Sequence, residues 1–106
     1  MPKRPTPRPW KVHARMRDCV TFEGQYGEEN LFIQNIDGYF ACQNPDDAKL
    51  ISAAPELLAD LQEAAATLRR YETLHRAKGT DESAAKAEVN AALASRFEAT
   101  IAKATE

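Results

Sequence analysis

The side chains that could support catalysis or metal binding are few and scattered. His13 and His75 are far apart in the sequence, and Cys19 and Cys42 form neither a C-x-x-C motif nor a cluster with histidine. The adjacent glutamates at positions 28–29 could serve general acid–base catalysis only inside a pocket. The sequence lacks the motifs of serine hydrolases, zinc proteases, P-loop proteins and dinucleotide-binding proteins. We therefore expect no catalytic residue, no cofactor and no metal site, and a protein that is not an enzyme.

Basic side chains are concentrated near the N-terminus. Residues 1–17 carry six bases and no acid, whereas residues 18–106 carry eight bases and sixteen acids, for a net charge of −2 overall. A basic arm on an acidic body can bind phosphates or an acidic partner, and it can also dock on its own body or a second subunit. Trp10, Phe32 and Tyr39 could stack on bases if they are exposed. The candidate partner- or nucleic-acid-binding residues are Lys3, Arg4, Arg8, Lys11, His13, Arg15 and Arg17.

Prolines separate this arm from the rest of the chain. Residues 1–9 hold four prolines, which lack the backbone N–H and restrict φ, so they predict an extended basic arm. Residues 10–106 are expected to form a single α+β domain, with a sheet in residues 10–43 and helices in residues 45–104.

Alternating polarity predicts the first strands of the sheet. Residues 10–16 place apolar side chains on one face and basic ones on the other, and residues 20–26 alternate in the same way. Gly24 lies inside the second strand and is interpreted as a bulge, and residues 27–30 are expected to form a polar turn. Glu23 could lie opposite the basic face of the first strand and pair with it.

An Asp-Gly pair at residues 37–38 predicts a hairpin. It lies between two β-rich segments, residues 31–36 and residues 39–43, and suits a type I′ turn, which needs φ > 0 at both positions. The expected sheet is therefore antiparallel with three to four strands.

The pattern then changes to that of helices. Asn44 is a suitable N-cap and Pro45 suits the first helical position, so a short helix is expected over residues 45–54. Pro55 lacks the N–H needed inside a helix and is expected to separate this helix from a longer one. The helices are thus a short one followed by an antiparallel pair of longer ones.

Two regular apolar stripes run along the longer helices. From Leu57 onward the spacing alternates between four and three residues, which predicts one packing stripe. Gly79 is expected to end that helix, and after Thr80 apolar residues recur at every fourth position from Ala85 to Ile101. The residues expected to form a dimer or helix-packing seam are Leu57, Leu61, Leu68, Tyr71, Leu74, Val89, Leu93, Phe97 and Ile101.

The composition favours a homodimer. Hydrophobic residues make up 43% of the chain, but 19 of them are alanines, and only 25 are large apolar or aromatic residues. A helix pair so rich in alanine buries little area by itself, and small domains are marginally stable. An apolar stripe left over from intrachain packing commonly marks an interface. No apolar run approaches the roughly 20 residues of a membrane-spanning helix, so no membrane partner is expected.

Three segments resemble a set of small phage and prophage proteins. Residues 6–12, T-P-R-P-W-K-V, are similar to the T-P-G-P-W opening of that family, with Arg8 in place of the usual glycine. Residues 44–61 resemble the family's L-I-x-x-A-P-E-L-L-x-x-L block, and residues 102–105 resemble its A-K-A-T ending. The resemblance implies a protein made by a bacteriophage or prophage in the host cytosol, and it implies no catalytic residues.

The function expected from these observations is protein binding. The hypothesis is a non-catalytic phage accessory protein that modulates or inhibits a bacterial host protein, such as a host-defence system, or acts on a phage protein. The alternative is a nucleic-acid-binding accessory protein that uses the basic arm and the first strand. The absence of an apolar segment after the basic N-terminus argues against a signal peptide, so both cysteines are expected to stay reduced in the cytosol.

Overall fold

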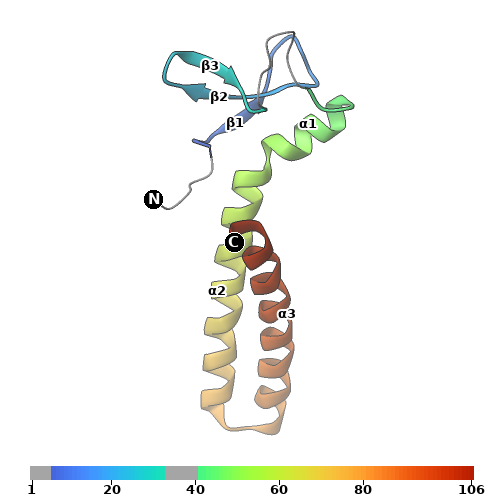
Figure 1. Ribbon diagram of the computed structural model, residues 1–106. Helices are drawn as coiled ribbons and strands as arrows, with labels where there is room; N and C mark the ends of the chain where they lie inside the picture. The colour runs from blue at the N-terminus through green and yellow to red at the C-terminus, as the bar shows by residue number, and fades with distance from the viewer. Residues whose placement is uncertain (1–5, 33–40) are drawn as a thin grey trace. The chain divides into compact units, whose positions relative to one another are not determined.

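The computed structural model describes residues 6–32 and 41–106 of the chain (Figure 1). A three-stranded antiparallel sheet is followed by a short helix and two longer helices, so the predicted α+β fold class is confirmed. Contacts within the chain group it into two compact units, Met1–Glu56 and Leu57–Glu106, and the division falls inside the second helix. We call the first the sheet unit and the second the helical hairpin; a single domain over residues 10–106 stays a prediction.

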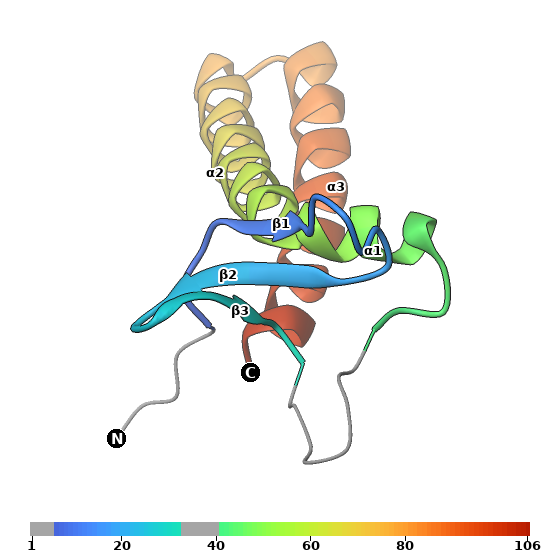
Figure 2. The same ribbon diagram turned by 90° about the horizontal axis from the view of Figure 1, so that it is seen from above.

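The sheet has the order β1-β2-β3, with β1 at Trp10–Val12, β2 at Val20–Gly24 and β3 at Gly27–Asn30 (Figure 2). Trp10 pairs with Phe22, and Gly24 pairs with Gly27. The expectation that residues 27–30 form a turn is therefore wrong, because the turn is shorter and lies at residues 25–26.

Two glycines explain this tight turn. Gly27 has φ +106°, a conformation that side chains with a Cβ rarely adopt, so it can close the turn and begin a strand at once. Gly24 ends β2 and is not a bulge in the pairing. A Cβ at Gly24 would meet the carboxylate of Glu29, which is the end of an exposed, flexible side chain and can move aside.

The first strand ends earlier than its alternating pattern predicts, because the side chain of His13 competes for the backbone. Nδ1 of His13 accepts the backbone N–H groups of Arg15 at 3.1 Å and Met16 at 3.0 Å. The N–H of His13 donates to the carbonyl of Cys19, and the N–H of Cys19 donates to the carbonyl of Met16, both at 3.0 Å. Residues 13–19 therefore form a closed turn, and the strand predicted to reach residue 16 stops at Val12.

The predicted hairpin at residues 37–38 lies outside the described residues, as does most of its two strands. Its described flanks, residues 31–32 and 41–43, are not in strands. The N–H of Leu31 donates to the carbonyl of Val20 at 2.8 Å, and the N–H of Cys42 donates to that of Asp18 at 2.7 Å.

Helix α1 spans Pro45–Ser52 and begins as predicted. Oδ1 of Asn44 accepts the N–H of Asp47 at 2.8 Å, and Pro45 occupies the first turn. The helix contacts β1 and β2, and the buried side chains of this unit include Cys19, Val20 and Ala48.

Helix α2 spans Ala54–Lys78, and its first three residues belong to the sheet unit. The rest of α2 and α3, Asp81–Thr105, form the helical hairpin, in which the two helices lie side by side and antiparallel (Figures 1 and 2). Gly79 has φ +71° and follows the last residue of α2, as expected for a helix stop. Oγ1 of Thr80 accepts the N–H of Ser83 at 3.1 Å and caps α3. Pro55 is the second residue of α2, where its missing N–H removes no helical hydrogen bond, so α2 begins one residue before the predicted break.

Candidate interaction surfaces

Glu28 on β3 draws together three side chains of the sheet unit. Its carboxylate accepts the hydroxyl of Thr21 at 3.0 Å and lies 3.6 Å from Nζ of Lys11. Nε2 of His13 is also 3.6 Å from this carboxylate. Because Nδ1 of His13 accepts two backbone N–H groups, Nε2 carries the ring proton and points it towards Glu28. The two histidine nitrogens are therefore both engaged in holding the turn and the sheet.

The carboxylates of the adjacent residues Glu28 and Glu29 point to opposite faces of the sheet. Neighbouring residues of a strand point to opposite faces. Glu28 faces Thr21 and Lys11, whereas the carboxylate of Glu29 lies against Gly24. Acid–base cooperation between the two carboxylates is not supported by this arrangement.

A hollow of about 560 Å³ lies beside the Glu28 cluster. Its walls combine polar and apolar residues: His13, Met16, Cys19, Thr21, Glu28, Glu29, Asn30 and Phe32. Burial, together with the neighbouring Asp18, raises the pKa of the Cys19 thiol, and burial also raises that of Cys42. A thiol with a raised pKa stays protonated and is a poor nucleophile or metal ligand. No group of three or more His, Cys, Asp or Glu side chains among the described residues could hold a metal ion.

The basic residues predicted to form one surface fall into separate sets. Lys11 and His13 are paired with Glu28, which takes the place expected for Glu23. Arg15 and Arg17 lie in the turn after β1 rather than on a strand face with Lys11. This part of the prediction is wrong because β1 ends at Val12.

Three arginines of the sheet unit are left without an internal partner in the described part of the chain. Arg8, Arg15 and Arg17 are exposed and form no ion pair with any described residue. Lys3 and Arg4 lie outside the described residues. Trp10 is half-buried and donates its indole N–H to the carbonyl of Thr6 at 3.1 Å, Phe32 is half-buried, and Tyr39 lies outside the described residues.

The turn between β1 and β2 presents Arg15, Met16 and Arg17 to solvent. Met16 is 40% exposed, and the two flanking arginines are also exposed. The hydrogen bonds from Arg15 and Met16 to the His13 ring hold the backbone of this turn in one conformation. We call residues 15–17 the arginine turn.

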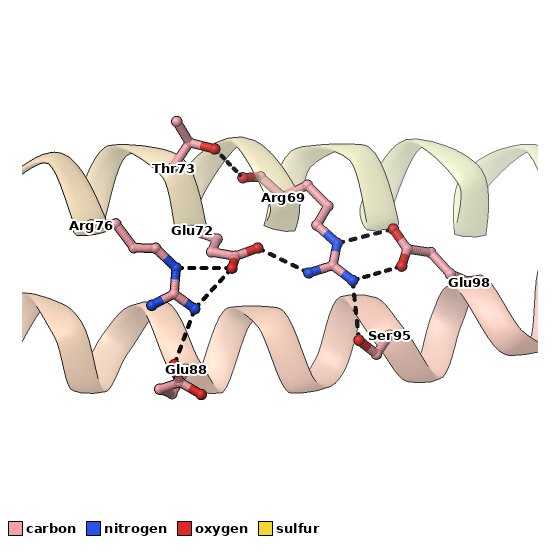
Figure 3. A network of polar contacts seen from close by, with 7 residues as sticks. All are labelled: Arg69, Glu72, Thr73, Arg76, Glu88, Ser95 and Glu98. Atoms are coloured by element: carbon pink, nitrogen blue, oxygen red, sulfur yellow. Dashed lines mark hydrogen bonds and ion pairs between the residues drawn. The ribbon is translucent and has the colours of Figure 1, made fainter.

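A charged network joins α2 to α3 on one flank of the hairpin (Figure 3). Arg69 makes a two-pronged contact with Glu98, at 3.0 Å from Nε and 2.7 Å from Nη2, and its Nη1 lies 2.9 Å from Glu72. Arg76 bridges Glu72 and Glu88, at 3.0 Å from Nε and 3.0 Å from Nη2. These arginines hold the pKa values of Glu72 and Glu98 below their usual range through hydrogen bonds. This network was not predicted from the sequence, although Arg69, Glu72 and Arg76 have the i, i+3, i+7 spacing of one helix face.

The residues buried in the hairpin are small. They are Ala65 on α2, and Ser83, Ala87 and Ala94 on α3. The every-fourth-residue stripe predicted on α3 is not the line that these buried residues follow, because Ala85 and Val89 are exposed. A step of four residues turns 40° beyond a full revolution at 3.6 residues per turn, so such a stripe drifts around the helix.

The large apolar side chains of the hairpin gather on the flank opposite the network. Successive residues of an α-helix are rotated by about 100° about its axis. On α2, this rotation places the apolar stripe on a different side from Arg69 and Arg76. On α3, it places the apolar stripe on the side away from Ser95 and Glu98. We call this surface the apolar face; it comprises Leu57, Leu61, Leu68 and Tyr71 on α2, and Val89, Leu93, Phe97 and Ile101 on α3. Tyr71 is 47% exposed and Val89 is 68% exposed, while Leu74 is also exposed and lies beside this face. Apart from Leu74, the seam residues predicted from the sequence therefore lie on one side of the hairpin. Binding of a second chain to that side stays a prediction.

The sheet and the hairpin together define a small α+β protein that exposes the arginine turn and the apolar face. The chain belongs to the family described as Salmonella phage P22 protein Y8K6, whose family model matches residues 1–106. The phage context that the sequence resemblance implied is therefore confirmed. Searches among curated proteins and among solved structures found no match. No helix in the described ranges is both long enough and apolar enough to cross a membrane.

Proposed function

We propose that this protein is a phage accessory factor that binds a bacterial host protein in the cytosol, such as a component of a defence system, without catalysing a reaction. The observation that carries the proposal is the arginine turn, which exposes a methionine between two arginines that form no ion pair with any described residue. Arginine and methionine are enriched at the buried centres of protein interfaces, and arginine is frequent among the residues that contribute most to affinity.

The conformation of the arginine turn supports this role. Because the His13 ring already holds the backbone of Arg15 and Met16, binding a partner would require little further ordering of the loop. The charge of the turn favours an acidic surface on the partner, since Arg15 and Arg17 have no acidic partner among the described residues.

The polar side chains beside the turn support binding rather than catalysis. The Glu28 carboxylate accepts a hydrogen bond from Thr21 and forms an ion pair with Lys11. The His13 ring accepts backbone N–H groups of the turn, and its other nitrogen faces Glu28. The hollow they line could accept a side chain of the partner next to Met16.

Capture from host cells tests the proposal with a matched control. The tagged protein, its R15A/R17A variant and a K78A/K103A variant are expressed in the bacterial host. The control removes the same two charges from exposed positions of the hairpin. We expect one host protein to be recovered with the wild type and the control but not with R15A/R17A, and purified components to bind at least tenfold more weakly with that variant. Equal recovery with all three proteins, or no specific protein with any, would contradict the proposal.

Nucleic-acid binding is the second candidate. The observation that favours it is that Arg8, Arg15 and Arg17 are exposed and form no ion pair within residues 6–32 and 41–106. Arginines that contact phosphates weaken binding to all sequences alike when they are removed, and each lowers the salt dependence by about one unit. The same three proteins can be compared by gel shift on DNA and RNA at two salt concentrations. A shift that depends on Arg15 and Arg17 would replace the protein-binding proposal, and no shift at low salt removes this candidate.

A further inference from the structure

The helical hairpin lacks a core of large side chains. Its fully buried residues are three alanines and a serine, and burial of an alanine methyl contributes little free energy. Leu61, Leu68 and Phe97 are only half-buried, although they are among its largest apolar residues. Small domains must bury most of their apolar surface to be stable. We therefore expect the apolar face of this hairpin to be buried against another protein surface.

We propose that the apolar face of the hairpin pairs with the same face of a second copy of the chain, forming a four-helix bundle. The α2 stripe consists of Leu57, Leu61, Ala64, Leu68 and Tyr71. Its alternating four- and three-residue spacing is the pattern of left-handed helix packing. Two-fold pairing of one surface patch with the same patch of a second copy is the commonest form of oligomer. In such a pair, the two hairpins are identical and therefore equal in length.

The size of the face suits a stable dimer. Each long helix has 25 residues. Helices of that length extend about 37 Å, and two helices packed about 10 Å apart present a face roughly 20 Å wide. The footprint of roughly 700 Å² is close to the ~800 Å² that each partner buries in a standard interface.

The distribution of charge also permits self-pairing. The network of Arg69, Glu72 and Arg76 with its partners on α3 lies on the other flank, so pairing of the apolar faces buries none of these charges. Buried unpaired charges are the strongest obstacle to association, and this arrangement avoids them.

Light scattering of the full chain over a concentration series tests the proposal. We expect a mass near twice 11.8 kDa at micromolar concentration. In the Y71E/V89E variant, which charges two positions that one chain leaves exposed, we expect the mass to fall to that of a monomer. The A99E variant adds the same kind of charge at an exposed α3 position off the apolar face, and it should remain dimeric.

Milder variants guard against loss of folding. If Y71E/V89E loses its helical circular dichroism signal, Y71A and V89A should instead raise the dissociation constant of the dimer about tenfold each while keeping the wild-type helicity. A wild-type mass of one chain at high micromolar concentration would overturn the proposal, and so would dimers that persist unchanged in the folded variants. The outcome is independent of the host-protein proposal, because these substitutions leave the arginine turn untouched.

Discussion

At the scale of single residues, the side chain of His13 connects the turn after β1 with β3. It accepts two backbone N–H groups in the turn, while its other ring nitrogen faces Glu28. One side chain therefore ends β1, shapes the arginine turn and joins the turn to β3. The alternating pattern of residues 10–16 could not reveal this, because a ring nitrogen that caps the backbone leaves no trace in hydrophobic periodicity.

Replacing His13 by alanine should loosen the turn. The H13A variant leaves two N–H groups without their acceptor, which should cost about 1–2 kcal/mol of unfolding free energy. Urea denaturation measures this cost, and amide hydrogen exchange at Arg15 and Met16 should become faster. The K11A variant removes only the exposed ion pair with Glu28 and should cost less than about 0.5 kcal/mol. Equal costs for the two variants would show that the ring does not hold the turn.

At the scale of elements, local sequence rules place the helix boundaries well. Asn44 with Pro45, and Gly79 with Thr80, mark starts and stops through capping and φ preferences that depend on few neighbours. The third strand could not be found in this way. Its residues, Gly-Glu-Glu-Asn, have low strand propensity and are held by pairing with β2, which is a contact between strands rather than a property of the segment.

The charged network predicts how the hairpin responds to acid. Glu72 and Glu98 titrate near 4.5 when unperturbed, and hydrogen bonds from Arg69 lower both pKa values in the folded hairpin. Groups with lowered pKa values stabilise the folded state above pH 4.5, and this contribution is lost as the pH falls through the folded values. Because the network is exposed, the effect should shrink in high salt.

The R69Q variant isolates the contribution of the network. It should raise the pKa of Glu98 towards its ordinary value, as measured by carboxyl-carbon NMR titration, and the thermal midpoint should fall less between pH 7 and pH 2.5 than in the wild type. R70Q is the matched control, because Arg70 is exposed and forms no ion pair with a described residue. An acid response of R69Q that matches those of R70Q and the wild type would contradict this role for Arg69.

At the scale of the whole molecule, each unit carries one of the two surfaces for which we propose binding. The sheet unit presents the arginine turn, and the helical hairpin presents the apolar face. The sequence predicted Arg15 and Arg17 and the apolar residues of the hairpin, since charge asymmetry and seven-residue spacing are visible without a structure. It did not predict the exposure of Met16, which the alternating pattern placed on the apolar face of a strand. It could not separate Lys11 and His13 from Arg15 and Arg17, because that separation depends on Glu28 lying across the sheet. A dimer joined through its hairpins would carry two arginine turns, and two linked binding sites increase the apparent affinity for a target with matching sites.

Crosslinking from the arginine turn is the most direct test of protein binding at this surface. A photoreactive phenylalanine analogue replaces Met16 in the protein made in host cells, and a second protein carries it at Ala99, an exposed position of the hairpin. Irradiation should yield one abundant adduct with a host protein from position 16 and none from position 99. Adducts of equal yield and identity from both positions, or an adduct with nucleic acid alone from position 16, would contradict protein binding at the arginine turn.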